Sequence, residues 1–325
     1  MSALVSILIP VYNSERLLGE AIESALSQTW AEKEVVVLDD GSSDNSLDII
    51  RRFDSRIRWE TGPNRGGNAA RNRLLELSRG EWLQYLDADD YLLPEKIDRQ
   101  MAFARRQPDC EIIFSPVIWE KVENGRRIWV ETQFPEPHDP WILLALWRLP
   151  QTGGPLWKRS ALKRAGGWRV GQSCCQEHEL YFRLLAAGCR VGFCADCLAA
   201  YRDWDHGPRL SLQRSAEVDR QRLLVLDRIE ECLGDRGALT PARRSALNDA
   251  RHQIARKQWV KDPDFALQIA RRIRQSDRVF CPSAGPASPF LYLLTYRLLG
   301  FQGAQRVAAC KRRLSSTLAA TAGRI

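Results

Sequence analysis

The sequence predicts an α/β fold, in which a mostly parallel sheet is flanked by helices and followed by a helical C-terminal extension. Three observations support this prediction. In the first hundred residues, short apolar runs alternate with amphipathic helical patterns at the spacing of βαβ units. Each apolar run ends in a polar loop, as the strands of an open α/β sheet do at the edge that binds ligands. Beyond Ser215, nearly every segment has a helical pattern.

The first hundred residues supply four expected strands and three expected helices. Val5–Ile9 is a β-branched run that we expect to stop at Pro10. A helix follows from about residue 15 to 28, with Leu18, Ile22 and Ala25 on one apolar stripe. Ser43 or Asp44 is the expected N-cap of the second helix. The other expected strands are 35–38, 57–60 and 82–86, and the second and third helices end near Phe53 and Ser78.

The later pattern is looser. It predicts strands at 112–114 and 128–130, a loop at 152–155 and a helix at 176–187. The helices beyond residue 215 are interrupted at Pro241, at Pro263 and over 282–289, because proline cannot continue a helix.

The composition is that of a globular chain. Its 325 residues are 44% hydrophobic and 27% charged, which excludes collagen-like, low-complexity and globally disordered classes. No window approaches the ~18 consecutive apolar residues of a membrane-spanning helix, and the N-terminus lacks the basic leader of a secretory signal. Nine cysteines, an odd number in a long chain, indicate free thiols in a reducing, cytoplasmic compartment.

Positive charge is concentrated in the C-terminal part. Residues 1–200 carry 25 basic and 28 acidic side chains, whereas residues 201–325 carry 23 and 12. An anionic membrane face, nucleic acid and a simple solvated helical surface are the three explanations of such a segment.

Two acidic loops follow expected strands. Asp39-Asp40 begins one, and Asp87-Ala88-Asp89-Asp90 forms the other. Because ligands bind beyond the carboxyl ends of the strands, we expect these loops to meet the loop at 10–13 at one edge of the sheet. Clustered carboxylates repel each other unless a cation neutralises them, and Mg²⁺ or Mn²⁺ held with substrate phosphates would do so. A solvated acidic turn is the alternative for the second loop.

Several common phosphate-binding motifs are absent from this sequence. There is no G-x-G-x-x-G after the first strand and no G-x-x-x-x-G-K-[ST] anywhere, which argues against a classical dinucleotide site and excludes a P-loop NTPase. A haloacid-dehalogenase phosphatase would carry its acidic pair on the first strand rather than the fourth.

Four motifs then match a known family in order and spacing. Ile9-Pro10-Val11-Tyr12-Asn13, Asp39–Asp44, Ala70-Arg71-Asn72 and Leu86-Asp87-Ala88-Asp89-Asp90 together resemble glycosyltransferase family 2, over roughly residues 1–210. The resemblance implies the GT-A fold, a Rossmann-like nucleotide-sugar half joined to an acceptor half. It implies a domain at 1–213, divided into 1–105 and 106–213, before a basic helical extension at 214–325.

The resemblance also implies roles for individual residues. Pro10, Val11 and Tyr12 would line the nucleobase pocket, and Asp40 would hydrogen-bond the base, usually uracil. Arg71 and Ala88 would lie near the nucleotide, and Asp87 would approach the ribose or the metal. Asp89 would bind the metal, Mn²⁺ or Mg²⁺, that bridges the donor phosphates. Tyr201-Arg202 followed by His206 resembles a stretch that closes the donor site, which makes His206 a second candidate metal ligand. Each residue also has an alternative role: Tyr12 could pack against its neighbours, Arg71 could form a local ion pair, and His206 could be structural.

The candidate general base departs from the family pattern. Members carry an Asp in E-D-x-x-L-x-x-R, whereas the matching stretch here is Gln176-Glu177-His178-Glu179-Leu180-Tyr181-Phe182-Arg183. This alignment assigns the base to Glu177, whose side chain is one methylene longer than Asp. A helix-N-terminal Glu stabilised by the helix dipole is the alternative role.

The implied activity is inverting transfer of a sugar from a nucleotide donor, with UDP as the expected nucleotide, to a glycan, lipid-linked or protein acceptor in polysaccharide synthesis. The Q-x-x-R-W motif of processive synthases is not matched, since Val279 follows Gln275-Ser276-Asp277-Arg278. A non-catalytic nucleotide-sugar-binding member and a sugar-phosphate nucleotidyltransferase remain the rival functions.

The C-terminal tail allows two interpretations. Phe290, Leu291, Leu294, Leu298 and Phe301 alternate with basic residues in this segment. The pattern is typical of a helix packed on the catalytic domain, which we favour, or of an interfacial helix docked on the inner face of a membrane. No nucleic acid partner is expected.

Overall fold

The computed structural model describes residues 2–123, 126–136, 138–195, 199–203, 215–285 and 288–322. The chain divides into two compact units, Met1–Gln221 and Arg222–Ile325. Each unit is described by itself below.

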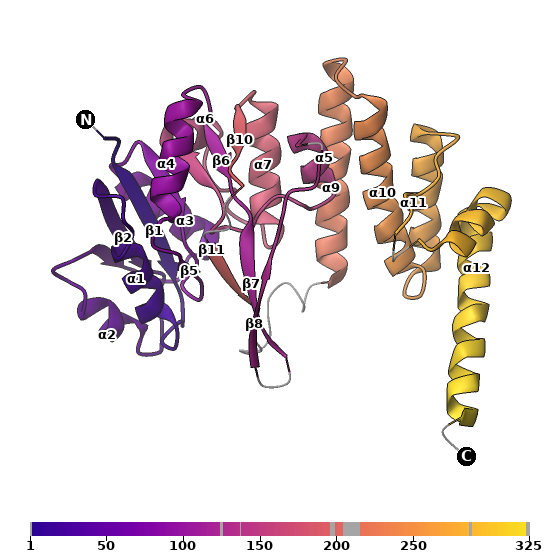
Figure 1. The fold of residues 1–325 in the computed structure, drawn as a ribbon, viewed down its shortest axis with the longest axis horizontal. Helices are drawn as coiled ribbons and strands as arrows, with labels where there is room; N and C mark the ends of the chain where they lie inside the picture. Colours follow the sequence, from indigo (N-terminus) through magenta and orange to yellow (C-terminus); the bar gives the residue numbers. More distant parts are fainter. Residues whose placement is uncertain are drawn as a thin grey trace. The chain divides into compact units, whose positions relative to one another are not determined.

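The first unit is built on a mixed sheet of seven strands (Figure 1). Its strands, in spatial order, are β10 (Val191–Phe193), β6 (Ile112–Phe114), β9 (Leu156–Lys158), β4 (Trp82–Tyr85), β1 (Val5–Val11), β2 (Lys33–Asp39) and β3 (Arg58–Thr61). β1 pairs in parallel with β2 and β4, β2 pairs in parallel with β3, and β10 does so with β6. β9 is antiparallel to both of its neighbours. The predicted α/β class with a mostly parallel sheet is confirmed.

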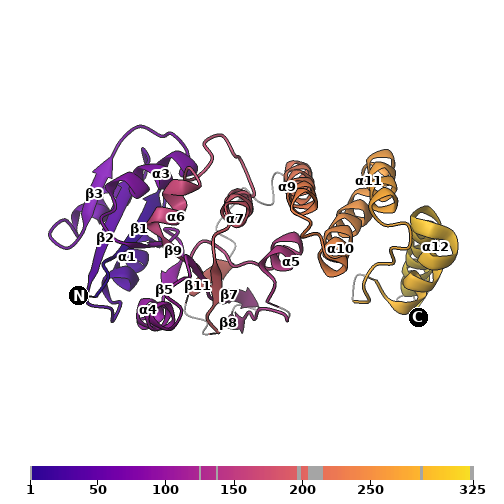
Figure 2. The same ribbon diagram turned by 90° about the horizontal axis from the view of Figure 1, so that it is seen from above.

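Helices cover both faces of this sheet. Figure 2 shows α1 (Leu18–Leu26) and α4 (Lys96–Arg106) on one side of the strands, and α3 (Gly67–Leu77) and α6 (Arg159–Arg164) on the other. β1 is therefore buried on both faces, which is why all of its residues except Ser6 are apolar. Ile7 and Ile9 share one core cluster with Leu18 and Ile22 of α1. The stripe predicted for this helix is thus the one that packs on the sheet.

Pro10 does not stop the first strand as predicted, because β1 continues through it to Val11. The reason is the length of the neighbouring strand. The β1–β4 ladder ends at the pair Leu8–Tyr85, so Pro10 is flanked on one side only, where it lies opposite Leu38 of β2. A proline at the edge of a ladder costs no hydrogen bond on its open side.

A second sheet of four strands lies in the same unit. Its order is β5 (Tyr91–Leu92), β11 (Ala199–Asp203), β7 (Val117–Glu123) and β8 (Arg126–Glu131). The sequence predicted β8 in part and gave no sign of β5, β7 or β11. By pairing with both β5 and β7, β11 brings a distant segment next to the acidic loop that precedes β5. The remaining helices of the unit are α2 (Ser46–Arg51), α5 (Pro140–Ala145) and α7 (Gln176–Ala186).

The second unit is helical. It takes the later part of α9 (Ser215–Asp235) and contains α10 (Pro241–Gln258), α11 (Pro263–Ser276) and α12 (Phe290–Ala322). Pro241 and Pro263 each stand in the first turn of a helix, after Thr240 and Asp262, whose side chains accept hydrogen bonds from backbone N–H groups of that turn. The predicted breaks at both prolines are confirmed. None of the described helices is both long and apolar enough to cross a membrane.

Candidate functional site

A cavity of about 800 Å³ opens at the carboxyl ends of β1, β2 and β4. Three loops, at 10–17, 40–44 and 87–89, form most of it together with the start of α3. Its lining comprises Pro10, Val11, Tyr12, Asn13, Ser14, Glu15, Arg16, Leu17, Asp40, Asp44, Asn64, Gly66, Gly67, Ala70, Arg71, Asp87, Ala88, Asp89, Gln176 and Arg202. The loops predicted to meet at one edge of the sheet do so.

The loops after β1 and β2 are tied to each other by hydrogen bonds. The Asn13 side-chain oxygen accepts from the N–H of Ser43 at 2.8 Å. Asp44 accepts from the N–H groups of Glu15 and Ser46, both at 3.0 Å. Although partial burial acts to raise it, the pKa of Asp44 is lowered by its hydrogen bonds from Ser46 and Glu15. Asn45, rather than Ser43 or Asp44, is the N-cap of α2, because the side chain of Asp44 is also engaged by the first loop.

Asp40 holds the glycine-bearing loop before α3. Its two carboxylate oxygens accept from the N–H groups of Arg65 and Gly66, each at 2.9 Å. The backbone of the two loops is in close contact, since a Cβ added to Gly41 would lie 2.7 Å from the nitrogen of Asn64. Gly41 also has a positive φ of 76°, which glycine adopts without strain. Asp40 therefore shapes this wall of the cavity as well as facing it.

Arg71 is a buried cation between two carboxylates. Its Nη2 donates to Asp87 Oδ1 at 2.8 Å, and its guanidinium lies 4.9 Å from the ring centroid of Trp168. Although burial acts to lower it, the pKa of Arg71 is raised by the charges of Asp87 and Glu177. Among the described residues, Nε of Arg71 is buried without a hydrogen-bond partner. The site thus presents an unused cationic donor, which suits an anionic ligand.

The acidic loop after β4 is anchored by Arg202 of β11. The N–H of Arg202 donates to Asp90 Oδ1 at 2.9 Å, and its guanidinium donates to the carbonyl of Asp89 at 3.2 Å. Burial, and then the charges of Asp89 and Asp87, raise the pKa of Asp90 well above its usual value. Asp90 is 3% exposed and is absent from the cavity lining, whereas Asp87 and Asp89 line the cavity.

These carboxylates form a donor set that fits a hard divalent cation. Mg²⁺ and Mn²⁺ prefer oxygen ligands, and Mg²⁺ is usually held by one or two carboxylates together with substrate phosphates. Within the described part of the chain, no cluster of three or more His, Cys, Asp or Glu side chains forms a complete metal site. An ion held by Asp87 or Asp89 could complete its coordination with the phosphates of a bound ligand. His206, the other predicted ligand, lies outside the described residues.

Glu177 stands in the first turn of α7. Its Oε1 accepts from the hydroxyl of Thr152 at 2.8 Å. The preceding residue, Gln176, lines the cavity, whereas Glu177 is not among the lining residues. Its negative charge helps to raise the pKa of Arg71. Cys175, just before the helix, has a left-handed backbone with φ of 60°. Such a conformation in a non-glycine residue is uncommon and often lies at a functional site.

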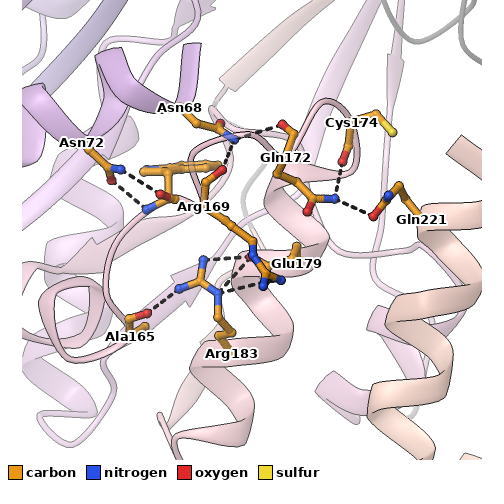
Figure 3. Close-up of polar contacts among 10 residues, drawn as sticks. Asn68, Asn72, Ala165, Arg169, Gln172, Cys174, Glu179, Arg183 and Gln221 are labelled. Carbon is orange, nitrogen blue, oxygen red and sulfur yellow. Dashed lines mark hydrogen bonds and ion pairs between the residues drawn. The ribbon is translucent and has the colours of Figure 1, made fainter. Parts of the chain in front are cut away.

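The loop before α7 is fastened to α3 by side-chain amides (Figure 3). Asn72 accepts from the N–H of Trp168 and donates to its carbonyl, both at 2.7 Å. Asn68 donates to the carbonyls of Arg169 and Gln172. Because the ring of Trp168 packs against the guanidinium of Arg71, these bonds help to hold the Arg71 side chain, which lines the cavity.

The other end of this loop is fastened to α7 by an ion-pair network. Glu179, 1% exposed, accepts from Arg169 at 3.3 Å and from Arg183 at 2.9 Å. Arg183 also donates to the carbonyl of Ala165, so the three side chains hold the first half of the loop, at residues 165 and 169, against the helix (Figure 3). Glu177 and Glu179 thus occupy different environments, although they are two residues apart.

The structure brings together most of the residues that the sequence predicted for the site. Pro10, Val11, Tyr12, Asp40, Arg71, Asp87, Ala88 and Asp89 all line the cavity. Sequence reasoning missed Thr152 and the support that Asn72 and Trp168 give to Arg71. Their partners lie 25 and 96 positions away, and no local pattern marks such contacts.

Known proteins resemble this chain both in sequence and in fold. Residues 6–165 match the family model described as glycosyl transferase family 2. A curated relative from Escherichia coli, the UDP-Glc:alpha-D-GlcNAc-diphosphoundecaprenol beta-1,3-glucosyltransferase WfaP, is 40% identical over 102 residues, 31% of this chain and 41% of its own. The chain covers less than half the length of this and the other first-ranked curated relatives that it matches.

Two solved proteins share the fold at low identity. S. aureus TarS 1-349 is 18% identical with a TM-score of 0.64, covering 95% of this chain and 91% of its own. The same protein in complex with UDP-GlcNAc has a TM-score of 0.61 at 17% identity, covering 95% and 92%. The mannosyltransferase PcManGT from Pyrobaculum calidifontis, in complex with GDP-Man and Mn²⁺, is 17% identical with a TM-score of 0.53, covering 96% and 87%. The fold is therefore GT-A.

Proposed function

We propose that this chain, whose residues 6–165 are a glycosyl transferase family 2 domain, transfers a sugar from a nucleotide donor to an acceptor hydroxyl. One observation carries the proposal. The cavity is lined by an exposed aromatic, Tyr12, by the carboxylates Asp87 and Asp89, and by the cation of Arg71, which is ion-paired with Asp87. A nucleoside diphosphate presents a base, a ribose and two phosphates that such a set can bind.

The donor we propose is a UDP-sugar. Tyr12 is 53% exposed, so its ring is available to stack on a base, with Pro10 and Val11 beside it in the lining. Asp40 would receive the base, and Asp87 with Ala88 the ribose. The name of the E. coli relative contains UDP-Glc, and TarS has been solved with UDP-GlcNAc. The GDP-Man complex of PcManGT makes a guanine nucleotide the alternative to test.

We assign Mn²⁺ or Mg²⁺ binding to Asp89, with His206 as a second candidate ligand. A bound divalent ion acts as a Lewis acid that offsets charge on the diphosphate leaving group, an effect of several kcal/mol. Arg71 adds a fixed positive charge on the same side of the cavity, and Arg202 fixes the backbone of Asp89. The Mn²⁺ complex of PcManGT supports this assignment.

Glu177 is the proposed general base. Its carboxylate takes the proton of the acceptor hydroxyl, whose oxygen forms a bond to the anomeric carbon as the bond from that carbon to the diphosphate oxygen breaks. Attack on the face opposite the diphosphate inverts the anomeric configuration. Thr152 orients the carboxylate through its 2.8 Å hydrogen bond, and Arg71 supplies a nearby positive charge. General-base assistance contributes ~10²–10⁴-fold to the rate.

The acceptor belongs to glycan or polysaccharide synthesis. We assign residues 1–105 to the donor and 106–213 to the acceptor, which is a lipid-linked glycan, a polysaccharide or a protein. The diphosphoundecaprenol in the name of the E. coli relative favours the lipid-linked class. We place the reaction in the cytoplasm, at the inner face of the membrane when the acceptor is lipid-linked. Eight cysteines in the described residues are free thiols, which suits a reducing compartment.

The deciding experiment is calorimetric titration of UDP with and without Mn²⁺, on the wild type and on Asp89→Ala. We expect UDP affinity to require both the ion and Asp89. Asp109→Ala, which removes a carboxylate that is 72% exposed and ion-paired with Arg190, is the matched control and should bind like the wild type. GDP and ADP are titrated in parallel. Equal UDP affinity with and without Mn²⁺ in all three proteins would contradict the metal assignment.

A second function is favoured by one observation. Gln176-Glu177 replaces the Glu-Asp pair of the family, and Glu177 is absent from the cavity lining. A chain that binds a nucleotide sugar without turnover would show this pattern. UDP-sugar hydrolysis, measured over a panel of sugars, separates the two functions, because a binding protein would release no UDP under conditions in which calorimetry shows binding.

A further inference from the structure

The first turns of α12 expose a continuous apolar face. Phe290, Leu298 and Leu299 are 82%, 73% and 60% exposed, and Leu291 and Leu294 are 48% and 43% exposed. Their spacing places all five along one side of the helix. Contiguous apolar surface of this kind marks an interaction site, whereas single exposed leucines do not.

Two residues near this face are buried within the second unit, Tyr292 in the same helical segment and Phe301 just beyond the kink at Gly300. Tyr292 is 4% exposed, and its hydroxyl lies 2.9 Å from His252 Nε2 and 2.9 Å from Gln305 Nε2. Phe301 is 7% exposed and packs edge-on against Trp259. Of the five apolar residues named from the sequence, Phe301 is buried within the second unit and the other four are exposed, while packing on the catalytic domain stays a prediction. The exposed face therefore has a defined orientation on an ordered helix.

The charged residues of α12 itself are all basic. No acidic residue follows Asp277 in the sequence, whereas seven lysines and arginines do. Arg297, in the same helical segment, and Arg306, beyond the kink at Gly300, are both exposed. Two copies of this surface would bring cations against cations, which disfavours self-association. An anionic surface with an apolar layer beneath it complements both the apolar face and the basic residues of α12.

We propose that the exposed face of α12 docks on an anionic phospholipid bilayer. Phe290, Leu294 and Leu298 enter the layer between headgroups and acyl chains, and Arg297 and Arg306 contact lipid phosphates. The helix lies in the plane of the surface, because the apolar segment before the kink at Gly300 spans only residues 290–299 and no described helix can cross a bilayer. This docking is independent of the proposed reaction.

The test is co-sedimentation of the full chain with vesicles. One set contains phosphatidylglycerol and phosphatidylcholine, and the other contains phosphatidylcholine alone. The test variant is Leu294→Asp with Leu298→Asp. The control variant is Val260→Asp with Val279→Asp, which changes two apolar residues of the second unit, 77% and 89% exposed, that lie outside α12. Circular dichroism and thermal unfolding check that both variants fold.

We expect the wild type and the control variant to sediment with the anionic vesicles, and the test variant to partition at least tenfold less. Arg297→Gln with Arg306→Gln should weaken binding severalfold and reduce its salt dependence. Wild type that remains in solution with anionic vesicles would overturn the proposal. So would light scattering that shows a wild-type dimer and a monomeric test variant, because the face would then be occupied by a second copy. UDP titration of the same samples tests the proposed reaction separately.

Discussion

The two sides of the cavity are built by different kinds of contact. The sheet-edge loops, at 10–17, 40–44 and 62–67, hold each other through hydrogen bonds between segments 25 to 32 positions apart. The closing segments, which are the loop at 165–175 and β11, are held by residues 96 to 113 positions away. The contacts of the first side form within adjacent βαβ units. Those of the second side form only when segments far apart in the sequence have packed together.

This difference determines how each side of the cavity is encoded in the sequence. Loops at the ends of adjacent parallel strands meet wherever that sheet forms, so their chemistry is carried by short motifs. The closing segments depend on single side chains, such as Asn72 and Arg202, whose partners are settled only by tertiary packing. Changes in the two groups should therefore have different consequences for binding, turnover and stability.

The largest effect is expected from Glu177→Gln, which keeps the shape of the side chain and removes the base. Turnover should fall by ~10²–10⁴-fold, while UDP affinity and thermal stability stay near wild type. Steady-state transfer or UDP-sugar hydrolysis measures turnover, and calorimetry measures UDP affinity. Turnover within about twofold of wild type would show that Glu177 is not the base.

Glu179→Ala, two positions along the same helix, should instead lower the free energy of unfolding. Removing a buried carboxylate leaves Arg183 without its main partner, and breaking a buried pair costs about 3 kcal/mol in free energy of unfolding. Urea unfolding followed by tryptophan fluorescence reports mainly on the first unit, because ten of the eleven tryptophans precede residue 222. An unfolding midpoint equal to that of wild type would contradict the proposed structural role of Glu179.

Asn72→Ala tests the bond between α3 and the closing loop. Two hydrogen bonds to the backbone of Trp168 are lost, so the free energy of unfolding should fall by about 2 kcal/mol. Arg73→Ala, on the exposed side of the same helix, is the control and should change stability little, since exposed ion pairs contribute little. If both variants unfold alike, the side-chain amide does not hold the loop.

The smallest effect is expected from Thr152→Val, which removes only the hydroxyl that orients Glu177. Turnover should fall by about tenfold, the equivalent of one hydrogen bond to a charged group, with UDP affinity unchanged. Thr152→Ser restores the hydroxyl and should recover most of the rate. A serine variant as slow as the valine variant would attribute the loss to packing instead.

Most of the fold and one side of the site were predictable from the sequence. The strands 5–9, 35–38 and 82–86 were visible because they are buried on both faces, and the cavity residues followed from where those strands end. The second sheet was not visible, because β5 is two residues long and β11 pairs with strands about 80 and 110 positions before it. Thr152 carried no local signal, since only the fold brings it to Glu177.

The position of β9 has a consequence for biosynthesis. Residues 156–158 insert between β4 and β6, both of which precede them in the chain. Until they emerge from the ribosome, β4 has an unpaired edge, and an open edge of an apolar strand invites pairing with other chains. Polypeptides that end before residue 156 should therefore aggregate, although they contain the entire sheet-edge side of the cavity.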